Sequence, residues 1–431
     1  MKQEAINSLV TLSLFALLAG AFAGAGESSS LADRVDAIIV KGKTLPSSIL
    51  GASCGKYRLF AQQGSKLSAI PFQIDEYDPK GNILMKKGPK VRPDSDNEGF
   101  DANDELVFMA WDASEKVSGK PSVQGCDLFV EIAVIDAKKG STGYVYIARC
   151  SKPPSTSSKK YVNWDAAKLT VTTARYRLGF QRGNGFYYDY LSIFNGPNLL
   201  DRQKVRVAVG KGNLRMVFNE DNFKSNIQGY IDGPVRAVFY NLAEMKMGIL
   251  GSLPSPTINY FYRHWAHMPT IFDNSFNPAA MGLDFEIVIT HDFKLDRARG
   301  YKICTNSLPN CAAITGRMTP ELETISKKET NWGGIQGPEG AMITRFVIDP
   351  RMHTKAIGFY LDDDKARREP EYIPGSSPEV GFMITDWKSA SKGVFSLDFY
   401  HYFMKKYSVA EVERFDRLIF APLQVKTKLL K

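Results

Sequence analysis

Carboxylates recur at a regular spacing between two apolar, strand-like runs near the N-terminus. Five of them are spaced so that they could share one cation: Asp94, Asp96, Glu98, Asp101 and Glu105. With Gly99 they follow the spacing of an EF-hand loop, which has oxygen ligands at its first, third and fifth positions, Gly at the sixth and a bidentate Glu at the twelfth. The chemistry that this spacing indicates is calcium binding.

The flanking sequence departs from an EF-hand. Glu98 is longer than the usual ligand at its position, and Asp101 stands where an apolar residue is usual. Pro89 and Pro93 precede the loop, and a strand-like run follows it, so helices are not expected on either side. Two interpretations remain open: a calcium-binding connection between two strands, and an acidic turn exposed to solvent.

Histidines are the second group that could carry chemistry. His264 and His267 lie in YFYRHWAHMP, and His291 lies beside Asp292. On a helix, a spacing of three would place His264 and His267 on one face, whereas on a strand it places them on opposite faces. The surrounding sequence is typical of strands, which weakens a shared zinc site, and no HExxH, His-x-His or paired CxxC motif is present.

These histidines still define a test of function. If they converge with Arg263 and tyrosines in one open cleft, a carbohydrate-active lyase or epimerase is indicated. If they are scattered or buried against aromatic residues, a binding protein is indicated. No Gly-x-Ser-x-Gly, phosphate-binding GxxxxGK[ST] or haem-binding CxxCH motif offers another reaction.

Five cysteines suit an oxidising compartment. Cys126 and Cys150 flank two strand-like runs joined by a turn centred near Lys138, which predicts a cross-strand disulfide. Cys304 and Cys311 bracket the turn-rich TNSLPN, which predicts a second disulfide. Cys54 is left over, and its neighbours Ser53 and Gly55 give no sign of an activated nucleophile.

The N-terminus resembles a secretory signal. Lys2 precedes an apolar run from Leu9 to Phe22, and small-residue cleavage sites follow. We therefore expect residues 1–25 to be a signal peptide and the mature chain to be periplasmic or extracellular. No later run is long and apolar enough for a transmembrane helix.

The rest of the chain reads as short strands separated by turn residues, without alternating helices, which predicts an all-β protein. Ser151 to Lys160, SKPPSTSSKK, is a linker. It separates a small β-sandwich at 27–150 from a larger antiparallel β-sandwich or supersandwich at 161–431. Short helices are expected at Thr319 to Lys328 and Ser408 to Phe415.

Charge and aromatic residues suggest partners. Residues 159–215 contain eleven Lys and Arg against three Asp, in a chain of net charge +9. This stretch could face an anionic polysaccharide, an envelope component, a membrane surface or the acidic residues of 71–112, or it could be solvated. Nucleic acid is a poor candidate because no recognition motif is present. Aromatic runs at 186–190 and 260–265 could fill a core on one face and stack on a sugar with the other.

Two motifs resemble known families. IPFQIDEYD at 70–78 and FDANDELVFMAWD at 100–112 resemble the N-terminal part of a group of exported bacterial proteins of unknown function. DGPVRAVF at 232–239 resembles the GPVR strand of galactose-mutarotase-type supersandwich domains, which often belong to carbohydrate-active proteins. The second resemblance implies a supersandwich, but no catalytic residue of that family aligns here.

The sequence therefore predicts an exported, non-catalytic binding or envelope-associated protein, with a glycan as the candidate ligand. A lyase or epimerase that uses His264, His267 or His291 with Arg263 is the alternative. Calcium is the one cofactor that the residues suggest.

Overall fold

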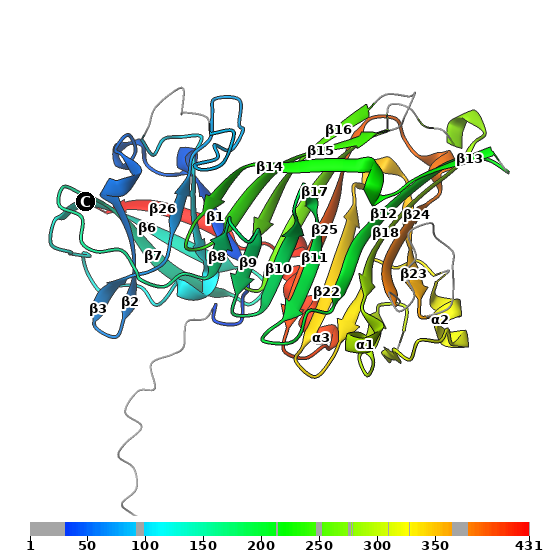
Figure 1. Cartoon of the computed structure of the whole chain (residues 1–431). Helices are drawn as coiled ribbons and strands as arrows, with labels where there is room; N and C mark the ends of the chain where they lie inside the picture. The colour runs from blue at the N-terminus through cyan, green and yellow to red at the C-terminus, as the bar shows by residue number, and fades with distance from the viewer. Residues whose placement is uncertain are drawn as a thin grey trace, which may run out of the picture.

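The computed structural model describes residues 31–91, 99–212, 214–246, 252–274, 277, 279–308, 310–326, 328–363 and 378–430. The predicted signal peptide lies outside this part of the chain, as do Asp94, Asp96 and Glu98 of the predicted calcium loop. Strands dominate the described residues, which confirms the prediction of an all-β fold (Figure 1).

Two sheets form the N-terminal sandwich. The smaller has the order β1 (Ala37–Lys41), β5 (Glu105–Met109), β4 (Gln73–Asp75). The larger has the order β26 (Gln424–Leu430), β6 (Cys126–Asp136), β7 (Ser141–Cys150), β2 (Tyr57–Gln63), β3 (Lys66–Ala69). Buried side chains such as Leu106, Phe108, Val130 and Ile132 fill the space between them. Alternation of apolar residues along β6 thus places one face in this core.

Two further sheets form the larger sandwich. The long sheet has the order β20 (Ala312–Ala313), β19 (Lys302–Thr305), β21 (Trp332–Gln336), β22 (Ala341–Ile348), β25 (Val394–Met404), β17 (Trp265–Asp273), β16 (Ser252–Phe261), β15 (Ala237–Lys246), β14 (Phe223–Asp232), β11 (Asn184–Ile193), β10 (Tyr176–Gln181), β9 (Thr170–Thr173), β8 (Val162–Asp165). The short sheet has the order β13 (Leu214–Phe218), β12 (Leu200–Lys211), β18 (Asp284–Phe293), β24 (Glu379–Thr385), β23 (Lys355–Leu361). Figure 1 shows the short sheet facing one side of the long, curved sheet.

Pairing is antiparallel throughout the described strands, apart from a parallel contact between β11 and β14 at Asn184 and Ser225. The described helices are α1 (Leu295–Ala298), α2 (Pro320–Ile325) and α3 (Val409–Phe420). Thr319 caps α2 and Ser408 caps α3 by accepting a backbone N–H three residues on, as the sequence predicts. None of the described helices is long and apolar enough to cross a bilayer.

Strand β5 joins the two sandwiches. All five of its residues are buried, without the alternation of a half-exposed strand. Leu106 and Phe108 face the N-terminal core, whereas Val107 and Met109 pack in the core of the larger sandwich. The continuous apolar run LVFM at 106–109 therefore reflects a strand that is covered on both faces.

The last strand crosses back to the N-terminal sandwich. β26 pairs with β6 along its length, with Val425 opposite Val134. The prediction placed all of 161–431 in the second sandwich, but these C-terminal residues complete the first. The rest of the domain division, including the linker at 151–160, stays a prediction.

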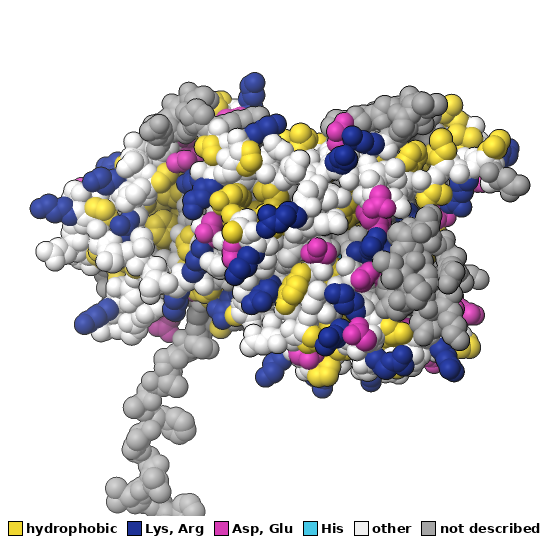
Figure 2. Space-filling view, in the orientation of Figure 1, with side chains coloured by type: hydrophobic (Ala, Val, Ile, Leu, Met, Phe, Trp, Pro, Cys, Tyr) yellow, Lys and Arg dark blue, Asp and Glu magenta, His cyan; other side chains and the backbone are white. Residues whose placement is uncertain are grey.

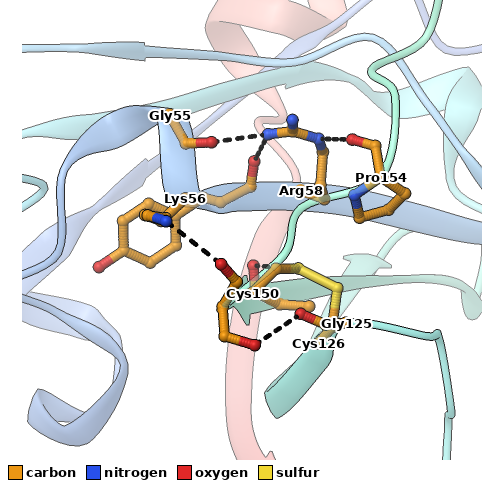
Figure 3. Close-up of a disulfide and its surroundings, with 10 residues drawn as sticks. Gly55, Lys56, Arg58, Gly125, Cys126, Cys150 and Pro154 are labelled. Atoms are coloured by element: carbon orange, nitrogen blue, oxygen red, sulfur yellow. Dashed lines mark hydrogen bonds between the residues drawn. A yellow bond between two sulfur atoms is a disulfide. The ribbon is translucent and has the colours of Figure 1, made fainter.

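Both predicted disulfides are present. Cys126 and Cys150 are opposed at the ends of β6 and β7, and Figure 3 shows their bond beside β2. Cys304 is bonded to Cys311 at the end of β19. Cys54 is free, and its thiol donates a hydrogen bond to Glu76 Oε1 over 3.2 Å.

The predicted linker, residues 151–160, has no strand or helix and lies along β2. Arg58 donates to the carbonyl oxygens of Gly55 and Pro154, and Lys56 Nζ donates to that of Ser151 (Figure 3). These bonds fix where the chain enters the second sandwich.

Candidate functional site

A buried ion-pair network fixes the two sandwiches against each other. Arg236, in the GPVR motif, donates from Nε to Asp75 Oδ2 over 2.8 Å and from Nη2 to Glu105 Oε2 over 2.7 Å. Its Nη1 donates to Tyr262 OH over 3.1 Å. Gln73 Oε1 accepts the backbone N–H of Arg236. These motifs are far apart in the sequence, and the fold brings them into one contact.

The same network bears on the predicted calcium site. Glu105, its expected bidentate ligand, is held by Arg236 and by Lys41 Nζ. The Asp101 backbone N–H donates to Asp104 Oδ2 over 2.9 Å. No cluster of three or more His, Cys, Asp or Glu suited to a metal occurs among the described residues, which do not include Asp94, Asp96 and Glu98. Calcium binding therefore stays a prediction.

A cleft of about 380 Å³ lies where the N-terminal sandwich, the linker and the long sheet meet. Its wall contains residues from all three: Gln62, Gln63, Trp111, Asp112, Lys159, Tyr161 and Arg263. Trp111 and Asp112 lie in the 3₁₀ turn Ala110–Asp112, directly after β5. Arg263 lies in the turn between β16 and β17, which is closed by a bond from Tyr262 N to Trp265 O. Loop residues held by rigid strands are a common setting for a binding site.

Asp112 is the central acid of this cleft. Its Oδ1 accepts a hydrogen bond from Tyr161 OH over 2.7 Å, and Trp111 Nε1 donates to the same phenol over 3.3 Å. Its Oδ2 is buried and has no hydrogen-bond partner among the described residues. Burial raises the pKa of Asp112 to about 6, although Tyr161, Lys159 and Arg263 act in the opposite direction. The carboxyl group therefore keeps an unused acceptor.

Arg263 supplies the complementary donor. Its guanidinium lies 5.3 Å from the centre of the Tyr161 ring, a cation–π distance. Its Nε is buried without a hydrogen-bond partner in the described part of the chain. The wall of the cleft thus includes a residue with a buried unpaired donor, a residue with a buried unpaired acceptor, an indole edge and two amides. This combination suits a ligand with many hydroxyl groups and a flat apolar face.

The three candidate histidines do not converge. His264 lies behind the Trp111 ring, with the ring centres 4.9 Å apart. His267 bonds through Nε2 to Asp398 Oδ1 over 2.7 Å and stacks on Tyr400. His291 is buried between the sheets and bonds to Tyr188 OH. Each packs against an aromatic ring in its own surroundings.

Protonation of His264 and His291 is disfavoured. Burial lowers the pKa of His264 to about 3, helped by the charges of Arg175, Arg263 and Arg414. Burial likewise lowers the pKa of His291 to about 4. Both rings are neutral at neutral pH, so neither is poised to donate a proton there.

A second, smaller hollow of about 260 Å³ lies on the other side of His264. Arg175, Lys405, Lys406 and Arg414 line it, with Glu411 as the one acid among its lining residues. Arg414 is paired with Glu411 over 2.9 Å. The surroundings of the cleft are therefore positively charged on the His264 side.

The basic stretch at 159–215 does not form one continuous face. Lys204 is buried in ion pairs with Asp292 and Glu379, at 2.9 and 3.1 Å. Lys160 pairs with Asp232. Figure 2 shows Lys and Arg spread over the visible surface rather than gathered in one patch. Of this stretch, Lys159 reaches the cleft and Arg175 reaches the adjacent hollow.

The sequence predicted Arg263 and His264 as candidate site residues, but not their neighbours in the structure. Trp111 and Asp112 ended the matched FMAWD string, and Tyr161 followed the linker directly. The available signal was their position: Trp111 and Asp112 follow a strand, and Tyr161 follows the linker. Such ends can meet at a junction between domains, where binding sites are common. Nothing in the sequence indicated that these particular ends meet.

Comparisons with known proteins do not identify a family. No family model matches the chain, and no curated protein matches it. Among solved structures, an alpha-mannosidase from Enterococcus faecalis V583 aligns with a TM-score of 0.42 at 8% sequence identity. The alignment covers 91% of this chain and 47% of the mannosidase, so the chain spans about half the length of that protein. A likeness at this level assigns neither a family nor an activity.

Proposed function

We propose that this chain is an exported, non-catalytic binding protein, and that its cleft at Trp111, Asp112, Tyr161 and Arg263 holds an acidic saccharide. The observation that carries the proposal is the pair of unpaired polar atoms, Asp112 Oδ2 and Arg263 Nε, at one cleft. A buried polar atom without a partner costs about 1–3 kcal/mol, and a ligand that bonds to it recovers that free energy.

Each group in the cleft has a role in this proposal. Arg263 and Lys159 attract a sugar carboxylate, and Asp112 accepts a sugar hydroxyl. Trp111, which is half-buried at the wall, offers an apolar edge to the sugar ring. The adjoining basic hollow at Arg175 and Arg414 favours an anionic over a neutral polysaccharide.

Binding is better supported than catalysis. Hydrolysis of a glycoside by the usual route needs two carboxyl groups, and Asp112 is the single carboxyl residue in the described cleft wall. Elimination needs a base, and burial and the neighbouring Asp112 raise the pKa of Tyr161 far above neutral pH, which leaves Asp112 as the one carboxyl base in the described cleft wall. The separation of His264, His267 and His291 removes the remaining candidates from a common site.

The test is a binding screen on the purified chain with both disulfides formed. Oligomers of polygalacturonate and alginate serve as acidic probes, and dextran oligomers serve as the uncharged control. The proposal expects saturable binding of at least one acidic probe, weakening as salt is added. Absence of binding to every acidic probe, or equal binding of dextran, would refute it.

A further inference from the structure

The larger sandwich contains a mostly apolar cavity of about 340 Å³ between its two sheets. Val207, Ile287 and Ile289 face it from the short sheet, whereas Met268 and Phe399 face it from the long sheet. The volume falls within the range of roughly 300–1,000 Å³ that is typical of small-molecule sites. It is separate from the saccharide cleft, with which it shares no wall residue.

The cavity has an apolar rim. Ile271 and Val394, which both line it, are 50% and 57% exposed. Large apolar side chains are left in contact with water there, at a cost that an apolar ligand would remove. An apolar chain that enters between the sheets would cover this rim and fill the interior together.

Polar side chains without partners adjoin the same cavity. Asn241 is fully buried, and neither its Oδ1 nor its Nδ2 has a hydrogen-bond partner among the described residues. Thr257 is 2% exposed, and its Oγ1 is also without a partner there. Asn241 and Thr257 are opposed across β15 and β16.

Strand geometry places both side chains on the cavity side of the long sheet. Thr257 and Asn259 are two residues apart on β16, so their side chains share a face. Asn259 lines the cavity, and Asn241, as the cross-strand partner of Thr257, lies on that face too. From the opposite sheet, Gln203 lines the cavity with an Oε1 that is buried and likewise unpartnered. Gln203 therefore brings an unused acceptor to the cavity wall, whereas Asn241 and Thr257 lie beside the wall residues on the same face of the long sheet.

We propose that this cavity binds a single-chain amphiphile with a neutral polar head, such as an amide. The chain fills the space between the sheets, and the head bonds to Asn241 and Thr257. A neutral head is favoured over a carboxylate because the described wall contains one acid, Asp273, and no Lys or Arg, and an unpaired buried charge is costly.

The experiment measures displacement of a dansyl-labelled fatty acyl amide from the whole chain by lauramide and by laurate. Lauramide should displace the dye saturably and bind more tightly than laurate at neutral pH. Val207→Phe, which fills the cavity, should lower the affinity for lauramide at least tenfold. Val217→Phe is the matched control, because Val217 lies on the same sheet and is 47% exposed; it should bind as the original chain does.

A second variant separates ligand binding from internal hydration. Thr257→Val removes the unpartnered hydroxyl with little change of shape. The unliganded variant should be as stable as the original chain or more stable, and its affinity for lauramide should be severalfold lower. A loss of stability with unchanged lauramide affinity would show that Thr257 bonds to an internal water, and would overturn the assigned head group. Lack of saturable binding, or equal effects of Val207→Phe and Val217→Phe, would overturn the site itself.

Discussion

Arg236 Nε donates to Asp75 Oδ2 over 2.8 Å, although the two residues are 161 positions apart and belong to different sandwiches. Both side chains are almost completely buried. Glu105 lies on the other side of the guanidinium and also pairs with Lys41, so two cations balance the two acids. This contact joins the acidic stretch of the first sandwich to the GPVR motif of the second. It also holds β5 and the turn at Asp112 against the long sheet, which forms the cleft.

Removal of this cation should strongly destabilise the fold. Arg236→Ala leaves Asp75 and Glu105 buried without it, and the loss of one partner of a buried pair costs about 3–5 kcal/mol. The free energy of unfolding in urea measures this. Arg351→Ala removes an exposed partner of Asp349 and should change the free energy of unfolding by less than about 1 kcal/mol. Equal effects of the two substitutions would contradict the structural role of Arg236.

Asp112 should make stability depend on pH with a defined sign. Burial raises its pKa in the folded chain to about 6, above the value in the unfolded chain, so its contribution is lost as pH rises through that value. Asp112→Asn removes the buried charge. It should therefore stabilise the chain by roughly 1–3 kcal/mol at about pH 8, and much less at about pH 4.

Asp165→Asn is the control for this pH profile. The backbone N–H of Lys168 lowers the pKa of the exposed Asp165, so the sign is reversed and no gain is expected at high pH. Urea unfolding at several pH values measures both variants. A gain for Asp112→Asn that does not change with pH would show that its carboxyl group titrates normally.

Tyr188 should support the core of the larger sandwich through its hydroxyl group. That hydroxyl lies between His291 Nε2 and His401 Nε2, and Thr344 Oγ1 is 2.9 Å from the other nitrogen of His401. Tyr188→Phe leaves two buried ring nitrogens unpartnered and should cost about 1–3 kcal/mol. Tyr190→Phe, on the same strand and half-buried, should change stability by less than about 0.5 kcal/mol. The thermal midpoint of each variant decides between these outcomes.

The two disulfides should differ in their contributions. Loss of the Cys126–Cys150 bond should cost about 2–4 kcal/mol. Loss of the Cys304–Cys311 bond should cost about 1 kcal/mol less, because chain entropy depends on loop length and its sequence separation is 7 rather than 24. Double Cys→Ala variants and urea unfolding measure both. A thiol count on the denatured, unreduced chain should find one group, Cys54; five would contradict both bonds.

Local patterns predicted much of this fold. The symmetric spacing of Cys126 and Cys150 about Lys138 predicted that these two residues are opposed, although a register shift between Cys126 and Leu128 moves the remaining pairs by one residue. Alternating apolar residues and turn residues identified most strands. Thr319 and Ser408 identified two helix starts, because a side-chain cap is a local interaction.

Contacts between distant segments were not predictable from one sequence. Nothing near β26 indicates that it pairs with β6, which ends at Asp136 whereas β26 begins at Gln424. Asp75 and Glu105 of the first sandwich bind Arg236 of the second, and neither motif by itself predicts that contact. Asp112 and Arg263 line one cleft because β5 and β16 end at the same junction. The strand patterns predict where each strand ends, but not how far apart the two ends lie.

The saccharide cleft is tested most directly by one comparison of affinities. Titration calorimetry measures the affinity of a polygalacturonate oligomer for three chains: the original chain, Arg263→Met and Arg299→Met. Arg299 is exposed and outside the cleft, so its replacement controls for the loss of one positive charge. Loss of a charge-assisted hydrogen bond costs about 1.5–3 kcal/mol, so Arg263→Met should weaken binding by at least about tenfold, whereas Arg299→Met should leave it unchanged. Equal affinities of all three chains would contradict the cleft as the site of binding.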